Sequence, residues 1–360
     1  MIAKGIFVRF IELVPHFMKR TKIPFASFSK EFKPKSFLLG FFVGLRILMD
    51  LVKKLASEVG VTEQEIKAFL HLAPRKYKVY TIPKRKSGVR VIAQPTSELK
   101  KLQRKFVKIV NFPTHECSMA YKKGVGIKQN AEIHQANTYL LKMDLENFFN
   151  SISPDIFWKV WSEFNPLPTS VDKLYIEKLL FWCPSKKNSN KLILSVGAPS
   201  SPNISNFCMS KFDDVVSKFC QDRNIIFTRY ADDLTFSTKK RDVLFEVPSL
   251  VQHALSEEFG RRLTINHSKT TFSSMAHNRH ITGITINNEG NLSIGRDKKR
   301  YIKHLVHQFK YNNLDEQDIY HLKGLLAFAK YIEPSFLGSL NEKYSFEVMK
   351  KIIRGDNEEV

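Results

Sequence analysis

The chain has 360 residues, and its 57 lysines and arginines outnumber its 35 aspartates and glutamates, so the formal net charge is +22. A chain of this length can bury a substantial core over two or three subdomains, at roughly 150 residues per domain, which excludes a small disulfide-stapled module. The positive charge favours a polyanionic partner such as nucleic acid, although charge alone also fits an acidic membrane surface or a merely soluble protein.

The N-terminal residues and the cysteines indicate the compartment. The apolar run from Phe37 to Leu45 is much shorter than the roughly 20 residues that cross a bilayer, and no signal-like core with a cleavage site precedes it. No metal-binding spacing or paired framework links the cysteines, which are Cys117, Cys183, Cys208 and Cys220. We therefore expect a cytoplasmic protein with no membrane partner.

The first elements are helical. Apolar residues recur at helical spacing through Leu51, Leu55 and Val59, and Thr62 with Glu65 forms a capping box for a second helix. A basic hairpin follows, with strands expected at 77–83 and 89–92 around the turn 84–88. Residues 1–70 are thus predicted to be a helical lead-in.

The middle of the chain alternates strands and helices. A strand at 139–143 should end at Asp144, a helix should begin at Ser153-Pro154, and another should run from near Ser205 through Phe219. The apolar strand 225–230 then turns at Ala231-Asp232-Asp233 into a returning strand at 234–237. This hairpin would carry two acids at its tip.

The elements expected after residue 250 allow the fold class to be predicted. We expect a covering helix at 250–259, strands near 263–266 and at 281–286, and basic helices beyond Gly295. The order predicts an α+β fold with a largely antiparallel sheet backed by helices on one face. We place the region boundaries at 1–70, 71–290 and 291–360.

Three carboxylates are the candidate metal ligands. Nucleotidyl transfer from a nucleoside triphosphate uses two Mg²⁺ ions roughly 4 Å apart, and Mg²⁺ prefers oxygen ligands from converging carboxylates. Asp144 at a strand end and Asp232 with Asp233 at a hairpin tip can converge in this way. An arbitrary Asp-Asp pair would merely satisfy turn preference, but the apolar flanks Tyr230 and Leu234 leave little other reason for charge.

The sequence then resembles a known family in several places. Tyr230-Ala231-Asp232-Asp233 is similar to the signature hairpin of reverse transcriptases, and 143–149 (MDLENFF) resembles their first catalytic motif. The order of the remaining motifs also agrees, with 197–202 (GAPSSP), 266–270 (NHSKT) and the basic hairpin 84–90. The resemblance covers roughly 77–295 and implies a right-hand polymerase with fingers and palm at 71–290 and a thumb at 291–360.

Two short patterns resemble the retron branch of that family. Asn130-Ala131 followed by His134 matches the Asn-Ala-x-x-His pattern, and Ile281-Thr282-Gly283 resembles the Val-Thr-Gly tripeptide. We also expect no maturase, endonuclease or integrase extension after Val360, as in the retron branch. A core histidine and a strand glycine would be the ordinary explanations.

The resemblance implies roles for individual residues. Asp144, Asp232, Asp233 and the backbone of Leu145 would hold two Mg²⁺ ions, and Phe149 would be the steric gate that selects deoxynucleotides. Lys84 and Arg90 would contact the triphosphate, and Gly197, Ala198 and Pro199 would position nucleotide and template. Lys269 would neutralise or protonate the leaving pyrophosphate, while Asn130, His134, Thr282 and Gly283 would help to recognise RNA.

The chain departs from the family pattern at one position, and a basic helix follows the matched motifs. The family usually has Gln before the Gly-Ala-Pro motif, where this chain has Val196, so nucleotide affinity or fidelity would differ. Basic residues alternate with apolar ones from Arg296 to Lys310, which suits a thumb that holds template and primer or an ordinary amphipathic helix. His304, His307 and His321 lack a Cys or acid to complete a zinc site.

The implied activity is RNA-directed DNA polymerisation. In a retron, part of a cognate noncoding RNA would be copied into single-stranded DNA from a guanosine 2′-hydroxyl, with deoxynucleoside triphosphates as substrates. An effector protein would join the RNA–DNA product in phage defence. A group II intron-type enzyme and an inactive RNA-binding scaffold are the two alternatives.

Overall fold

The computed structural model describes residues 51–84, 88–110, 112–185, 191–277 and 279–354. Contacts divide the chain after Leu48, and everything below concerns the unit Met49–Val360. The predicted start of the helical lead-in, the apolar run 37–45 and the centre of the basic turn lie outside the described residues. No helix in the described ranges is both long and apolar enough to cross a membrane.

The first elements form the predicted helices and hairpin. The predicted helices are α3 (Leu51–Val59) and α4 (Glu63–Leu72). They pack with α5 (Ser97–Ile109) and α9 (Ser170–Leu180), which the sequence analysis did not predict. Thr62 caps α4, and the capping box with Glu65 is present as expected. Strands β1 (Tyr77–Pro83) and β2 (Val89–Pro95) pair in antiparallel register, and most of this ribbon is exposed.

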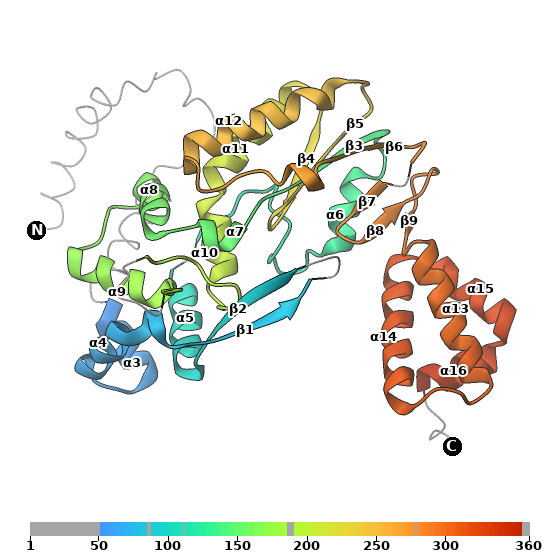
Figure 1. The fold of residues 1–360 in the computed structure, drawn as a ribbon, viewed down its shortest axis with the longest axis horizontal. Helices are drawn as coiled ribbons and strands as arrows, with labels where there is room; N and C mark the ends of the chain where they lie inside the picture. Colours follow the sequence, from blue (N-terminus) through green and yellow to red (C-terminus); the bar gives the residue numbers. More distant parts are fainter. Residues whose placement is uncertain (1–50, 85–87, 111, 186–190, 278, 355–360) are drawn as a thin grey trace, which may run out of the picture. The chain divides into compact units, whose positions relative to one another are not determined.

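A four-stranded antiparallel sheet lies at the centre of the described unit (Figure 1). Its order is β4-β5-β3-β6, from the strands β4 (Ile226–Tyr230), β5 (Asp233–Thr238), β3 (Tyr139–Asp144) and β6 (Thr271–Ser274). Phe227 and Phe236 stack on one face with ring centroids 4.7 Å apart. Because side chains alternate along a strand, the register places Asp144 and Asp233 on the other face.

Several helices accompany the strands of this sheet along the chain. They are α6 (Ile127–His134), α7 (Phe148–Ser151), α8 (Pro154–Phe164), α10 (Ser201–Cys208), α11 (Ser210–Asp222) and α12 (Val247–Phe259). Helix α11 packs against both β4 and α12, while α6 contacts β4 and the following small sheet. An aromatic cluster fixes α8 to α10, with Phe157 and Trp161 both against Phe207.

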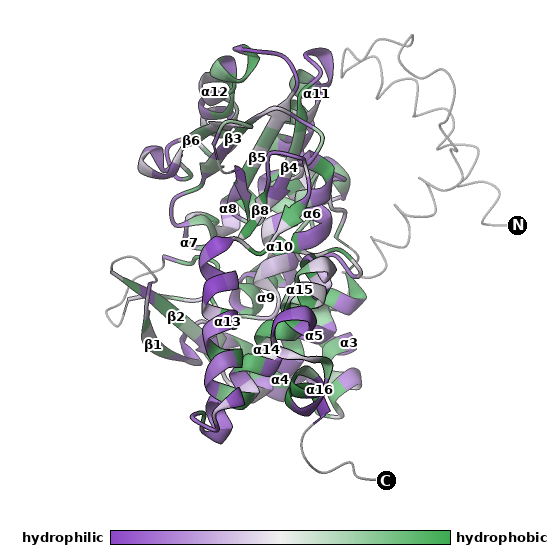
Figure 2. Cartoon of the chain, turned by 90° about the vertical axis from the view of Figure 1, so that its right-hand side faces the viewer, coloured by the Kyte–Doolittle hydropathy of each residue, from purple (hydrophilic) through white to green (hydrophobic). Residues whose placement is uncertain are grey.

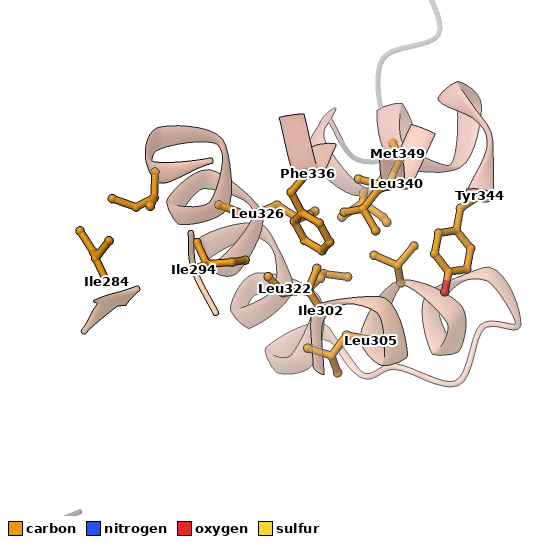
Figure 3. Close-up of a cluster of buried hydrophobic side chains, with 14 of the residues drawn as sticks. Ile284, Ile294, Ile302, Leu305, Leu322, Leu326, Phe336, Leu340, Tyr344 and Met349 are labelled. Carbon is orange, nitrogen blue, oxygen red and sulfur yellow. The ribbon is translucent and has the colours of Figure 1, made fainter. Parts of the chain in front are cut away.

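The C-terminal part is a small sheet followed by four helices. The strands are β7 (Arg279–Ile281), β8 (Ile284–Ile286) and β9 (Leu292–Ser293), and the helices are α13 (Arg296–Lys310), α14 (Glu316–Ile332), α15 (Pro334–Tyr344) and α16 (Phe346–Arg354). Their buried side chains form one cluster, in which Ile294 lies beside Leu326 and Ile284 lies at one end (Figure 3). Ala131 of α6 and Leu140 of β3 belong to the same cluster, so the C-terminal helices share a core with the central sheet.

Three predicted elements are wrong in detail. The strand at 281–286 is a hairpin, because Thr282 and Gly283 both have positive φ and turn the chain between β7 and β8. Residues 263–266 form only an isolated bridge through Ile265. The helix expected from Ser205 is two helices, α10 and α11, which meet at Met209.

Candidate active site

The predicted convergence of the acids is present in the strand register. Asp144, the last residue of β3, is paired with Asp233, the first residue of β5. Residues paired in this way have Cα atoms about 5 Å apart. Asp232 lies in the preceding turn, and its carbonyl accepts a hydrogen bond of 3.0 Å from the amide of Leu145. The three acids therefore lie at one edge of the sheet.

The backbone around Leu145 is oriented by the bridge to Ile265. Asp144 offers its carbonyl to the amide of Asn266 at 2.7 Å, and Glu146 donates its amide to Thr264 at 2.9 Å. In an antiparallel bridge, successive residues direct their polar groups to opposite sides. The carbonyl of Leu145 is therefore directed to the same side as its amide, which is the side of Asp232.

Burial and mutual repulsion raise the pKa values of two of these acids, Asp232 and Asp233. Burial, followed by the charge of Asp233 and more weakly that of Asp144, raises the pKa of Asp232 to about 6. Burial also raises the pKa of Asp233, although Lys142 partly opposes this. Such repulsion means that negative charge is concentrated here without full compensation, which is the condition that a bound cation would relieve.

Lys269 already supplies one positive charge to the cluster. Its ammonium nitrogen lies 2.8 and 3.0 Å from the two carboxylate oxygens of Asp144. The hydrogen bond and charge of Asp144 raise the pKa of Lys269. Lys269 is the last residue of the short helix η4 (His267–Lys269), and its side chain is largely exposed. The sequence motif around Lys269 thus does reach the acids.

The donor set fits Mg²⁺ as an open site. Among the described residues, no group of three or more His, Cys, Asp or Glu side chains is arranged so that it could hold a metal ion without other ligands. Mg²⁺ usually keeps several waters and takes one or two carboxylates together with substrate phosphates, so a cage made only of protein is not required. Asp144, Asp232 and Asp233 provide carboxylates of the right chemistry at adjacent strand ends.

A buried arginine lies beneath the turn that carries Asp232. We call β4, β5 and the turn between them the acidic hairpin. Arg229 is fully buried, and its guanidinium donates to both oxygens of Asp213 at 2.7 and 2.6 Å, to Asn206 at 3.0 Å and to the carbonyl of Ala231 at 3.2 Å. Ala231 has φ of +58°, a conformation that costs a residue with a side chain about 1–3 kcal/mol.

The Gly-Ala-Pro segment is attached to the basic ribbon. The amide of Ala93 in β2 donates to the carbonyl of Val196 at 2.9 Å, and the Ser195 hydroxyl donates to the carbonyl of Ala93 at 3.0 Å. Gly197 has φ of +126°, and a Cβ there would lie 3.1 Å from the carbonyl of Ala93. Glycine is therefore needed at this close approach. Ala198 is buried, whereas Pro199 is half-buried.

Lys84, Arg90 and Phe149 are placed on accessible parts of the unit. Lys84 and Arg90 are exposed on the ribbon, where the amide of Lys84 donates to the carbonyl of Gly88 across the turn. Phe149 is half-buried in α7, and its ring meets that of Phe148 edge-on at 5.2 Å. The structure describes no contact that joins these three side chains to the acids.

Tyr121, which the sequence analysis did not single out, interacts electrostatically with Asp232. Burial raises its pKa, the charge of Asp232 adds to that rise, and the charge of Arg90 opposes it. The phenol thus lies within electrostatic range of both the acids and the ribbon. The only local signal was an aromatic residue followed by two lysines and glycine, which is also the composition of an ordinary basic turn.

Asn130 and His134 lie in the interior. Both are buried in α6, and the ring nitrogens of His134 lie 2.7 Å from the hydroxyls of Ser237 and Thr228. Thr228 donates to the side chain of Asn130 at 2.7 Å. Burial lowers the pKa of His134 to about 3, so the ring is neutral. Any influence of this pair on RNA must act through the surfaces that α6 supports.

Thr282 and Gly283 form the turn between β7 and β8. Gly283 is exposed, and its carbonyl accepts a hydrogen bond of 3.3 Å from the Lys298 side chain in α13. Helix α6 contacts both strands of this hairpin. The two retron-like patterns therefore lie on neighbouring elements, although they are separated by about 150 positions in the sequence.

The basic helix α13 has two kinds of cation. Lys298, Lys299 and Lys303 lie over phenylalanine rings of α14 and α15. Arg296 and Arg300 are exposed instead, one turn apart on the same face. The turns of α13 that face the viewer in Figure 2 are largely hydrophilic. This exposed face can meet phosphate without unpacking the helix.

Comparison with known proteins agrees with this geometry. The pattern of the family "Reverse transcriptase (RNA-dependent DNA polymerase)" matches residues 82–286. The Escherichia coli retron Ec83 reverse transcriptase is 47% identical over 278 residues, which cover 77% of this chain and 89% of that protein. The chain belongs to the retron reverse transcriptases.

Further similarities are more distant. The retron Ec86 reverse transcriptase of Escherichia coli is 29% identical over 328 residues, which cover 86% of this chain and 95% of that protein. Among solved structures, a telomerase from Candida albicans aligns at 14% identity with a TM-score of 0.43, over 78% of this chain and 61% of that chain.

Family membership gives the acid cluster its chemical context. A retron reverse transcriptase is an RNA-directed DNA polymerase, and reverse transcriptases use divalent metal ions. The matched range 82–286 includes the three acids, Lys269 and the Gly-Ala-Pro segment, as well as Asn130 and His134 in α6. The expected enzyme class and the right-hand polymerase fold are therefore confirmed.

Proposed function

We propose that this retron reverse transcriptase copies part of a cognate structured noncoding RNA into single-stranded DNA that remains joined to the RNA. The observation that carries the proposal is the convergence of Asp144, Asp232 and Asp233 at one sheet edge, in a chain 47% identical to a retron reverse transcriptase. Synthesis would begin at a guanosine 2′-hydroxyl of the RNA. The product would act in phage defence with a separate effector protein, in the cytoplasm.

In this proposal the three acids and the Leu145 carbonyl hold two Mg²⁺ ions. When bound, the ions would lower the pKa of the attacking hydroxyl and neutralise the departing pyrophosphate. The chain contributes the fixed positions of the carboxylates, because the register of β3 with β5 and the Leu145–Asp232 hydrogen bond hold them in place. Lys269, which is already beside Asp144, would shift to the leaving pyrophosphate and neutralise it.

The nucleotide would lie between the ribbon and the sheet edge. Lys84 and Arg90 would bind its triphosphate, since both side chains are exposed on the ribbon. The segment Gly197–Pro199 would position the base and the template strand, since it is attached to β2 through Val196. Phe149 would lie beneath the sugar and exclude a 2′-hydroxyl. With Val196 in place of the usual Gln, we expect altered nucleotide affinity or fidelity.

Recognition of the cognate RNA would involve two areas. Asn130 and His134 would act indirectly by holding α6, while the exposed turn at Thr282 and Gly283 would offer backbone groups to RNA. The exposed cationic face of α13 would bind phosphates of the template, the primer or an RNA stem. Such contacts predict an affinity that falls steeply as salt concentration rises.

The deciding experiment uses the chain together with its flanking noncoding DNA. Nucleic acid is isolated from expressing cells and examined for branched single-stranded DNA that changes mobility after RNase treatment. The wild-type chain should give a defined band, and the Asp232→Ala/Asp233→Ala variant should give none. Asp214→Ala, which removes an exposed acid of α11 that pairs with Lys218, is the matched control and should keep the band.

The other outcomes separate the alternatives. If no such DNA forms but the purified chain extends a generic primed RNA, the chain is a reverse transcriptase of the group II intron type or of another bacterial branch. If the folded chain binds RNA tightly, and equally well after Asp232→Ala/Asp233→Ala, but never polymerises, it is a binding scaffold. Either result would overturn the proposed synthesis of RNA-linked DNA.

A further inference from the structure

The turn of the acidic hairpin has an unusual backbone for its sequence. Two residues, Ala231 and Asp232, join β4 to β5, and φ is positive at the first of them. Hairpin turns with positive φ at that position favour glycine, because a Cβ is strained there. An alanine keeps this conformation only where the surrounding structure imposes it.

Arg229 provides the contact that holds this conformation. Its guanidinium donates to the carbonyl of Ala231, which belongs to the peptide group joining Ala231 to Asp232. A peptide group is planar, so fixing its oxygen also fixes the amide nitrogen of Asp232. On the other side of Asp232, its own carbonyl is held by the Leu145 amide. Both peptide groups that flank Asp232 are therefore anchored.

The arginine is itself anchored to two helices. Asp213 of α11 takes two of its hydrogen bonds, and Asn206 of α10 takes a third. The Asn206 amide nitrogen donates to the carbonyl of Ala120, which orients that side chain. Backbone hydrogen bonds add to this, since the Arg229 amide donates to Cys117 at 2.8 Å. The guanidinium thus links the turn to α10 and α11 through hydrogen bonds, so the turn is held at a fixed position relative to both helices.

Stability alone does not account for this arrangement. A fully buried ion pair costs much desolvation, and well-packed apolar residues often replace one without loss of stability. The charges of Arg229 and Asp213 compensate each other, but a lysine would provide the same compensation. What lysine lacks is the planar fork that serves Asp213, Asn206 and Ala231 at the same time.

We propose that Arg229 is a positioning residue for nucleotidyl transfer, which holds the Ala231–Asp232 peptide group so that the Asp232 carboxylate has a fixed direction. The inference rests on the proposed role of Asp232 as a metal ligand. It assigns to Arg229 no contact with the substrate, and it predicts an effect on turnover without an effect on the binding of template and primer.

The test compares two variants of the full chain. Arg229→Lys keeps the charge and removes the fork, and Arg229→Met/Asp213→Leu removes the whole pair without leaving an unpaired charge. Two controls change α11 or its contact with α8. Lys211→Met/Glu163→Gln deletes the ion pairs of Lys211 with Glu163 at 3.0 Å and with Glu258 at 3.3 Å, and Val216→Ala shortens a fully buried side chain of α11.

Four quantities are measured on each variant. They are turnover and KM for dTTP on poly(rA) primed with oligo(dT), the Kd for that primed template, and amide hydrogen exchange in peptides that cover 225–238. For Arg229→Lys we expect kcat to fall by about 100-fold, as for a displacement of about 1 Å in a reacting group. Kd and KM should stay within about twofold, and exchange should accelerate in 225–238 but not in α13.

The opposite results are equally clear. Turnover within about threefold of wild type in folded Arg229→Lys or in the double variant would overturn the inference. So would a loss of turnover that Val216→Ala reproduces at equal loss of stability, because the arginine would then only support the fold. If the wild-type chain itself does not polymerise, the proposed function fails. Unchanged exchange in 225–238 would then still refute the positioning of the turn.

Discussion

The neutral, buried His134 predicts a specific dependence of stability on pH. The unfolded chain takes up a proton on this residue below about 6.5, whereas burial in the folded chain delays uptake to about 3. Folding therefore excludes a proton between these values, and stability is lost as the pH falls. One proton changes the free energy of unfolding by about 1.4 kcal/mol per pH unit, so His134 should remove about 2 kcal/mol between pH 6.5 and pH 5.

A second group has the opposite trend and must be removed first. The pKa of Asp232 is raised to about 6 in the folded chain, so folding favours its protonation and stability rises as the pH falls below 6. The two contributions would partly cancel in the wild type. The comparison is therefore made with Asp232→Asn as the background, with and without His134→Gln.

The assay is urea unfolding followed by circular dichroism at several pH values from 7.5 to 5. At pH 7.5, His134→Gln should destabilise the background by about 1–3 kcal/mol, because the hydrogen bonds to Ser237 and Thr228 are weakened or lost. At pH 5 that difference should shrink by about 2 kcal/mol, since glutamine does not titrate. Parallel pH profiles for the two proteins would refute the argument that the buried ring excludes a proton.

Three further variants test other parts of the structure. Gly197→Ala places a Cβ 3.1 Å from the Ala93 carbonyl, so it should raise KM for nucleotide on primed RNA by about tenfold or more, with template Kd unchanged. Phe149→Val should allow ribonucleotide incorporation, measured as the ratio of kcat/KM for UTP and dTTP; an unchanged ratio would remove Phe149 as the steric gate. Leu322→Ala empties a fully buried position among the C-terminal helices and should cost about 2–5 kcal/mol in urea unfolding, and a smaller loss would mean that those helices are loosely packed.

The acids could be predicted because their positions depend on local pattern. A strand at 139–143 and a hairpin around Asp232 follow from alternation and turn chemistry over a few residues. Only the pairing of β3 with β5 is non-local, and it brings Asp144 opposite Asp233. Once β3 ends in an acid and β5 begins with one, few antiparallel registers keep their apolar faces together. Most of the arrangement of the three acids can therefore be predicted from the sequence.

Arg229 could not be assigned in the same way. Its partner Asp213 lies in a different element, and no spacing rule links an arginine in a strand to an aspartate in a helix. The available signal was a charge within the apolar strand 225–230, which would ordinarily be placed on the exposed face. The strand at 281–286 was wrong for a related reason. Thr282 adopts a positive φ that β-branched residues rarely show, so only Gly283 indicated a turn.

The shared hydrophobic cluster limits how these enzymes can be recombined. Ala131 and Leu140 belong to one cluster with Ile284, Ile294 and the buried side chains of α13 to α16. A chimera that exchanged only the residues after Gly295 between two retron enzymes would bring together side chains that had not evolved as neighbours. A graft intended to change the recognised RNA must therefore carry matching residues of α6, β3 and β7 to β9, which come from three separate stretches of the sequence.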